Sequence, residues 1–175
     1  MKQTSAIPDF YYFIFAVYEP FLTFTGFIGA IIDPQGTHNA QAPWRNSSPP
    51  PATLPQATIV TIIQLGHVCA LVGAVNCFIL SAARRHLHDQ VALQERIAFA
   101  LLTPLMVGDL LHLYVTLWAL GDQRWNFRNW SPMLWATILL GLTLIIPRIA
   151  WHLGVGRYVD SRDGATSRSY MREKR

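Results

Sequence analysis

Apolar residues along this chain gather in four long runs that are separated by polar segments. The runs cover about residues 10–32, 57–83, 97–120 and 132–153. Each is long enough to cross the hydrocarbon core of a bilayer, which needs roughly 20 apolar residues in a helix. A backbone in lipid must satisfy its own hydrogen bonds, and the short alternating segments of a membrane barrel are absent from the sequence. The pattern therefore predicts an all-α, four-helix transmembrane bundle.

The composition agrees with a membrane protein. Hydrophobic residues make up 51% of the chain and charged residues only 14%, against about 25% charged residues in a soluble domain. The formal net charge is +4, but the basic residues lie at the ends of the apolar runs and form no stripe that would suit nucleic acid. We therefore expect membrane lipid, and no nucleic acid, among the partners.

The Lys and Arg residues also predict the orientation. Of the 14, eleven lie in the N-terminus, between the second and third runs, or from Arg148 onward, and three lie in the other two loops. By the positive-inside rule both termini face the cytosol, and we expect a multi-pass protein of the endoplasmic reticulum. The transmembrane domain covers residues 1–158, and residues 159–175 form a basic tail that we expect to be disordered. The loop of residues 33–56 would face the lumen, where Asn46 begins an Asn-Ser-Ser glycosylation motif.

Four ionisable side chains lie inside the apolar runs: Glu19, His67, Asp109 and His112. With a rise of about 1.5 Å per residue, the first three lie roughly 13–18 Å inside their helices, near the middle of a core about 30 Å thick. An ionisable group there costs about 2.5–3.5 kcal/mol, so we expect all four to face the bundle interior. Carboxyl and imidazole groups in a low dielectric can deliver and remove protons, which makes these four the candidate catalytic residues.

Amide and aromatic side chains on the same helices are candidate substrate-binding groups. Gln64 shares a helix face with His67, and Tyr114 follows His112 on the third run. Trp118 and Trp135 could offer π faces to a cationic intermediate. We therefore expect a lipophilic small molecule as the ligand.

A structural interpretation of the buried polar residues stays open. A carboxylate–histidine pair can hold two helices together through a polar contact worth about 0.6–2 kcal/mol. Glu19 could serve only the kink at Pro20, because proline frees a backbone carbonyl one turn earlier. Metal-ligand types occur in His86-Leu87-His88-Asp89, but their spacing fits no closed site, so we expect no metal and no cofactor.

Two short motifs carry a resemblance to known proteins. Tyr18-Glu19-Pro20 in the first run and Gly108-Asp109-Leu110-Leu111-His112 in the third resemble a group of small uncharacterised fungal four-helix membrane proteins. This resemblance covers about residues 10–151, and that group has no established catalytic motif.

A looser resemblance is to the EXPERA, or emopamil-binding, class of membrane proteins. Its sterol isomerases shift a double bond with acidic and histidine side chains inside the bundle. The resemblance implies such roles for Gln64 with His67 and for Asp109 with His112, although Glu19 is not part of that pattern. Fungal integral-membrane terpene cyclases also use buried carboxylates, but they are longer and have more helices.

These observations lead to two main hypotheses. The first is an acid–base isomerase or cyclase for an isoprenoid or sterol-like intermediate of a secondary-metabolite pathway, with Asp109 or Glu19 as proton donor and His67 and His112 as partner bases or orienting groups. The second is a non-catalytic protein that binds lipid or scaffolds other membrane-bound pathway enzymes. A carrier or channel is a third, less direct hypothesis. An enzyme should have a cavity at the level of Glu19 and Asp109, whereas a scaffold should fill that level by packing.

Overall fold

The computed structural model describes residues 5–44 and 49–164. Its first long segment comprises α1 (Asp9–Tyr12), the π-helical η1 (Phe13–Tyr18) and α2 (Glu19–Ile32), which follow one another without a break. The other long helices are α4 (Gln56–His86), α5 (Val91–Ala119) and α6 (Pro132–His152). These four segments are long and apolar enough to cross a membrane, and the described residues contain no strand. The predicted all-α, four-helix fold is confirmed.

Short helices connect the long ones. In the loop after α2, Asp33 caps α3 (Pro34–Asn39) by accepting a hydrogen bond from the Gly36 N–H at 2.7 Å. Two 3₁₀ segments, η2 (Gly121–Trp125) and η3 (Phe127–Asn129), link α5 to α6. The predicted helix ends agree closely with the structure except at the α4–α5 connection, where both helices run further toward each other than the apolar runs do. Asn46 lies outside the described residues, so its predicted glycosylation remains a prediction.

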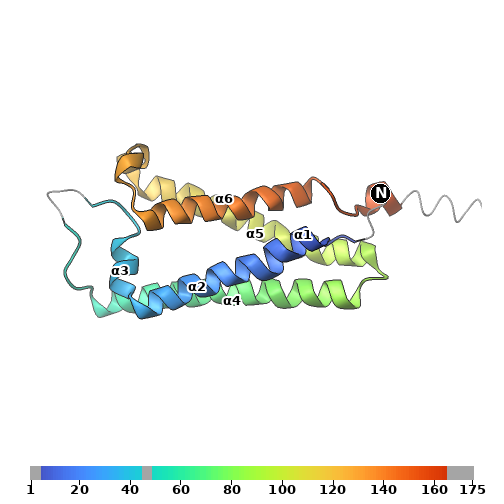
Figure 1. The fold of residues 1–175 in the computed structure, drawn as a ribbon, viewed down its shortest axis with the longest axis horizontal. Coiled ribbons are helices and arrows are strands. Elements are labelled where there is room, and N and C mark those ends of the chain that lie inside the picture. Colours follow the sequence, from blue (N-terminus) through green and yellow to red (C-terminus); the bar gives the residue numbers. More distant parts are fainter. Residues whose placement is uncertain (1–4, 45–48, 165–175) are drawn as a thin grey trace, which may run out of the picture.

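The long helices form two antiparallel pairs (Figure 1). The α1–η1–α2 segment packs along α4, and α5 packs along α6. Contacts between the two pairs come mainly from η1 with α6 and from α4 with α5. The pairs therefore meet at the end that carries α1 and η4, which we call the inner end, and diverge toward the outer end, which carries α3 (Figure 1).

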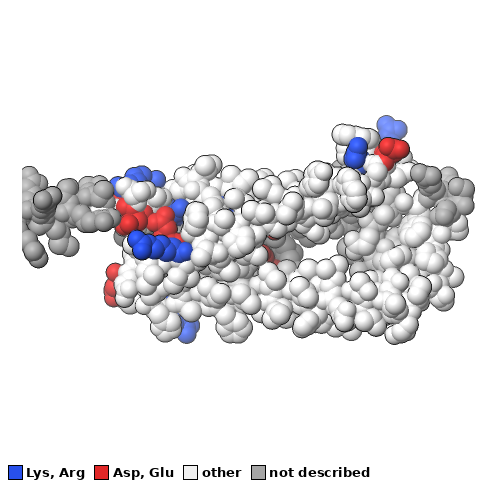
Figure 2. All heavy atoms as spheres, turned by 180° about the vertical axis from the view of Figure 1, so that it is seen from behind, with Lys and Arg blue, Asp and Glu red and all other residues white. Residues whose placement is uncertain are grey.

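Charged side chains gather at the two ends of the molecule (Figure 2). The surface between the ends is almost free of charged atoms on the face shown, apart from acidic atoms visible inside a hollow at mid-length. Many large apolar side chains along the four long segments are exposed, including Phe21, Phe78 and Ile146. A surface of this kind suits lipid, which cannot solvate charge.

Small residues allow α2 and α4 to approach closely. A Cβ atom added at Gly73 would lie 2.2 Å from the Thr23 Oγ1 and 3.0 Å from the Pro20 Cα. One added at Gly66 would lie 3.3 Å from the Phe27 ring and 3.5 Å from the Ala30 Cβ. Close backbone approach at small residues is a common basis of helix association in lipid.

We predict that Gly73→Ala lowers stability by about 1–3 kcal/mol, because the new methyl group must displace backbone at Pro20 as well as a side chain. Gly29→Ala is the matched control, since a Cβ there meets nothing within 4 Å. It should be neutral or slightly stabilising, as alanine favours the helix by about 1 kcal/mol. The measurement is the thermal unfolding midpoint of each purified variant in detergent, and a Gly73→Ala midpoint at or above the wild-type value would contradict the prediction.

A π-helical segment precedes Pro20 in the first long segment. Proline lacks an N–H, and its ring clashes with the carbonyl of the residue four positions earlier, here Ala16. The wider π turn of η1 ends at Tyr18, directly before Glu19 and Pro20. The distortion expected at Pro20 is therefore present, and it places Glu19 at the junction of two helix types near mid-bundle.

The inner end holds the tightest core. Ile7, Phe15, Leu80, Leu102 and Trp151 are almost fully buried there. The chain start is fixed by side chains of two helices: the Gln94 Oε1 accepts hydrogen bonds from the Ser5 Oγ at 3.0 Å and the Ala6 N–H at 2.9 Å, and the Trp151 Nε1 donates to the Ala6 oxygen at 2.8 Å.

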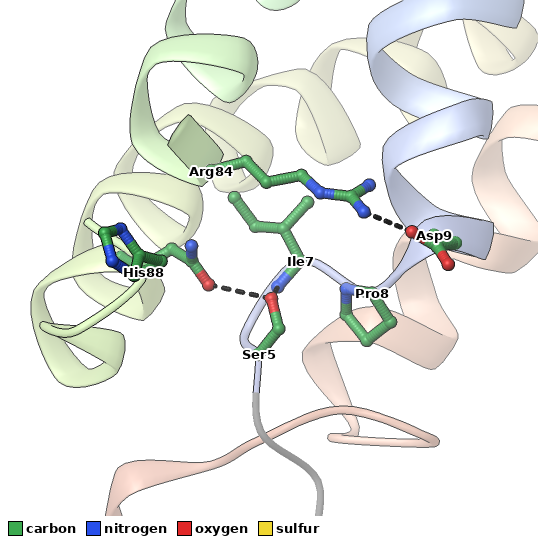
Figure 3. Close-up of a pocket in the computed structure, with 7 residues that line it drawn as sticks. Ser5, Ile7, Pro8, Asp9, Arg84 and His88 are labelled. Atoms are coloured by element: carbon green, nitrogen blue, oxygen red, sulfur yellow. Dashed lines mark hydrogen bonds and ion pairs between the residues drawn. The ribbon is translucent and has the colours of Figure 1, made fainter. Parts of the chain in front are cut away.

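A polar pocket of about 520 Å³ opens beside this segment, lined in part by Ser5, Asp9, Arg84 and His88 (Figure 3). The Arg84 guanidinium is ion-paired with Asp9 and lies 4.6 Å from the centre of the Tyr12 ring. The charge of Arg84 is thus already neutralised, and the pocket offers an anion little.

The first part of the predicted disordered tail is ordered, which corrects that expectation for residues 159–164. The π turn η4 (Asp160–Gly164) docks on α5, because the Asp160 N–H donates to the Glu95 Oε2 at 2.7 Å. Glu95 also pairs with the buried Arg157 at 2.6 Å. Burial and a hydrogen bond to Asp160 raise the pKa of Tyr158, so its hydroxyl stays a donor. Residues 165–175 lie outside the described part of the chain.

Candidate functional site

A cluster of three charged side chains lies where the two helix pairs meet. Arg148 of α6 donates from Nη2 to the Glu19 Oε2 of α2 at 2.6 Å, and from Nη1 to the Asp109 Oδ2 of α5. Its guanidinium also lies 5.1 Å from the centre of the Phe15 ring. We call Glu19, Asp109 and Arg148 the charge cluster. It joins helices from both pairs, because it links α2 to α5 and α6.

The three members differ in exposure. The Arg148 side chain is 0% exposed and that of Glu19 is 6% exposed, whereas that of Asp109 is 23% exposed. Asp109 is therefore the member that a molecule outside the cluster can reach. Two carboxylates share one guanidinium, so with all three groups ionised the cluster carries one surplus negative charge.

Sequence reasoning missed Arg148, which it counted with the cytosolic tail. The structure places it inside the bundle, four residues before the end of α6. A signal was present: within the four apolar runs Arg148 is the only Lys or Arg, and two of those runs carry a carboxylate. Buried charges are normally paired, so the two carboxylates required a cation on another helix. The count that predicts the topology changes only from eleven basic residues to ten on that side.

The predicted four-residue catalytic constellation does not form as a unit. Glu19 and Asp109 come together, but among the described residues no hydrogen bond or ion pair joins His67 or His112 to either carboxylate. His67 is exposed on α4 and meets the Phe27 ring edge-on at a centroid distance of 5.8 Å. The expectation that all four face the interior is thus corrected for His67, and the His112 side chain is exposed as well. His112 lies one turn beyond Asp109 on α5 and lines a neighbouring cavity.

That cavity lies between the two helix pairs, on the outer side of the charge cluster, and we call it the outer cleft. Its volume is about 440 Å³. Its walls are residues of α2 and α4 on one side, and His112 of α5 and Thr137 of α6 on the other. Thr23 and His112 line it, one turn from Glu19 and Asp109 respectively, so the inner part of the cleft adjoins the cluster. The level of the carboxylates themselves is filled by Arg148, which is the result expected of a scaffold, and the cavity begins one turn further toward the outer end.

The predicted substrate-binding residues do not line the outer cleft. Gln64, Tyr114, Trp118 and Trp135 are all exposed, and none belongs to the cleft walls. Trp135 instead packs on Trp130, with ring centroids 4.9 Å apart, beside the loop that joins α5 to α6. Trp118 and Trp135, which lie near the ends of α5 and α6, fit the interfacial belt that aromatic side chains form at membrane surfaces.

Two buried polar groups beside the cluster have no hydrogen-bond partner. Both side-chain atoms of Asn76 on α4 and the Nε of Arg148 are unpaired within the described residues, and both residues are 0% exposed. Asn76 lies close to Glu19. An unpaired buried polar group is costly, so this part of the cluster has hydrogen-bonding capacity to spare.

No metal centre is evident in residues 5–44 and 49–164, where no three His, Cys, Asp or Glu side chains converge. His88 lies 2.9 Å from Asp89, but both side chains are exposed. Cys69 and Cys77 are free thiols. Cys69 lines the outer cleft.

The fold and the site define the class of protein: a bundle of four membrane-length helices that encloses one arginine between two carboxylates. Residues 4–158 match a family model described as Domain of unknown function (DUF7704), and the chain therefore belongs to that family. The match includes all three members of the charge cluster. Searches of curated proteins and of solved structures gave no match.

Proposed function

We propose that this protein is a membrane acid–base isomerase or cyclase for an isoprenoid or sterol-like molecule, in which Asp109 moves the proton. The observation that carries the proposal is the charge cluster: two carboxylates share one arginine beside a cleft, and Asp109 is the one that remains partly accessible. The proposed setting is a secondary-metabolite pathway in the endoplasmic reticulum, with both termini cytosolic.

The charge count explains why the cluster suits proton chemistry. An isolated charge in a low-dielectric interior is so costly that it is paired or neutralised. Arg148 can compensate one carboxylate, and a proton or a bound cation must compensate the other. A protonated Asp109 is then a proton donor next to an apolar cleft, and the ionised cluster would stabilise a carbocation that forms there.

The proposed reaction balances without a cofactor. The Asp109 carboxyl group protonates one carbon of a carbon–carbon double bond and becomes a carboxylate, leaving a cation on the other carbon. His112, one turn away on the cleft wall, removes a proton from a neighbouring carbon, and a new double bond forms. His112 then returns that proton to Asp109. In a cyclase, a second double bond of the same molecule attacks the cation before the proton is lost.

A second candidate function is a non-catalytic lipid-binding or scaffolding role, in which the charge cluster only clamps the two helix pairs together. It is favoured by the complete burial of Arg148 and its pairing with both carboxylates. Under this hypothesis the protein would act through other membrane-bound enzymes and would convert nothing itself.

The two candidates differ in what the chain does alone, which gives the test. Source cells with and without the gene are compared by mass spectrometry of their lipid extracts. If the protein is an isomerase or cyclase, the cells without the gene should accumulate one lipophile. They should also lack an isomer of that lipophile with the same elemental composition. The purified chain in liposomes should then convert the first into the second with no added cofactor. Loss of several products in the cells, with no conversion in the liposomes, would support the scaffold instead.

A further inference from the structure

The two ends of the outer cleft differ in chemistry. At its outer end are the polar side chains Thr37 and His38 of α3 and Gln41 beyond it. Its middle is apolar, with Phe27 of α2 and Ile62 of α4 among the walls. Its inner end adjoins the charge cluster. A molecule that matched these surfaces would have a polar group at one end only.

The polar end of the cleft lies at the membrane surface. The membrane-length part of the first segment ends at Ile32, and α3 follows directly after Asp33. His38 and Gln41 therefore lie at or beyond the end of the hydrocarbon core, where a hydroxyl group can keep hydrogen bonds to water and to side chains. A hydrocarbon tail attached to that hydroxyl group would extend into the apolar middle of the cleft.

The cleft is accessible from outside the bundle. Leu65, one of its wall residues, is 65% exposed, and His112 and Gly26 are exposed as well. The hollow seen between the helix layers in Figure 2 shows the same opening. Because the two helix pairs pack against each other mainly at the inner end, the outer half offers a side entrance that faces lipid.

We infer that the ligand of the outer cleft is an amphipathic lipophile with one hydroxyl-type polar group, which enters from the leaflet at the outer end. Its polar group lies at His38 and Gln41, and its hydrocarbon passes Phe27 toward Asp109. The volume of about 440 Å³ is within the usual range for a small-molecule site and suits an isoprenoid alcohol or a sterol. The direction of the reacting end rests on the proposed function, whereas the binding mode does not.

The test uses farnesol that carries a photoreactive diazirine and an alkyne, added to liposomes containing the full chain. After irradiation, labelled peptides are mapped by mass spectrometry. Labels are expected on the cleft walls of α2, α4 and α6. Thr137→Trp, which fills the cleft from α6, should reduce labelling at least fivefold. Leu139→Trp is the matched control on the same helix, because Leu139 is exposed and lines no part of the cleft, and it should label like the wild type.

A second arm tests the polar end. The double variant His38→Leu with Gln41→Leu should lower labelling by the alcohol probe about tenfold, the loss expected for one or two hydrogen bonds. Labelling by the corresponding hydrocarbon probe, which lacks the hydroxyl group, should not change. Labels spread over lipid-facing residues, or equal labelling of Thr137→Trp and wild type, would overturn the inference.

The outcome is separable from that of the proposed function through Asp109→Asn. This variant should label normally, because the carboxylate is needed for turnover and not for binding. Cleft labelling with a fully active Asp109→Asn would uphold the binding mode and reject the proposed catalysis. Loss of turnover in Asp109→Asn without cleft-specific labelling would uphold the proposed catalysis and reject the binding mode.

Discussion

Arg148→Met is expected to prevent the protein from accumulating as a folded bundle, or to lower its stability by about 3–5 kcal/mol. The substitution keeps the length of the side chain but leaves Glu19 and Asp109 without their cation. Glu19 is almost fully buried, so bulk solvent cannot replace the guanidinium. The loss also removes a side chain that joins α2, α5 and α6. The measurement is the yield of monodisperse protein from membranes, together with its thermal unfolding midpoint.

Arg128→Met is the matched control, because Arg128 is exposed in η3 and the same substitution there should be silent. A triple variant adds the converse test: Glu19→Gln, Asp109→Asn and Arg148→Met together remove every charge of the cluster. Replacing a complete buried ion cluster with neutral groups is often harmless, so the triple variant should fold better than Arg148→Met alone. If Arg148→Met accumulated and melted like the wild type, the cluster would have no structural role.

The sequence predicted the helices well and the inward faces poorly, for a physical reason. Helix length is set by membrane thickness, so apolar runs alone located all four long segments. The face that each helix turns inward cannot be predicted in this way. A helix in lipid is apolar on every side, so no hydrophobic asymmetry marks its inner face. Spacing thus placed Gln64 and His67 on one face of α4, but it could not show that both would be exposed.

Arg148 illustrates a second limit. Its neighbour Pro147 and its place near the end of an apolar run favoured a position in the cytosolic tail. Proline does not end α6, which continues to His152. The inner end of the bundle extends further still, because Trp151 and Arg157 are buried by the chain start and by α5. The one sequence signal for Arg148 was that Glu19 and Asp109 required a common cation. This pairing involves residues of three helices, so it cannot be recognised from any single apolar run.

Asp109→Asn is expected to reduce turnover by about 10² to 10⁴ while leaving insertion and folding intact, since general acid–base groups contribute that much to rate. Asparagine has the shape of aspartate, and its carbonyl oxygen can still accept a hydrogen bond from Arg148, but it carries no transferable proton. The change also removes the surplus negative charge, so stability should be equal or higher. The measurement is product formation in membranes, normalised to the amount of folded protein.

The control is Asp122→Asn, the same chemical change at an exposed carboxylate in η2, which should retain full activity. His112→Gln should lose activity to a similar degree if His112 returns the proton to Asp109. The double variant of Asp109 and His112 should then be little worse than either single one, because residues that act as a unit are not additive. Additive losses would mean that His112 acts separately, as a wall of the cleft. Full activity in Asp109→Asn, with full activity in Glu19→Gln as well, would leave the charge cluster a clamp between helix pairs and the scaffold as the function.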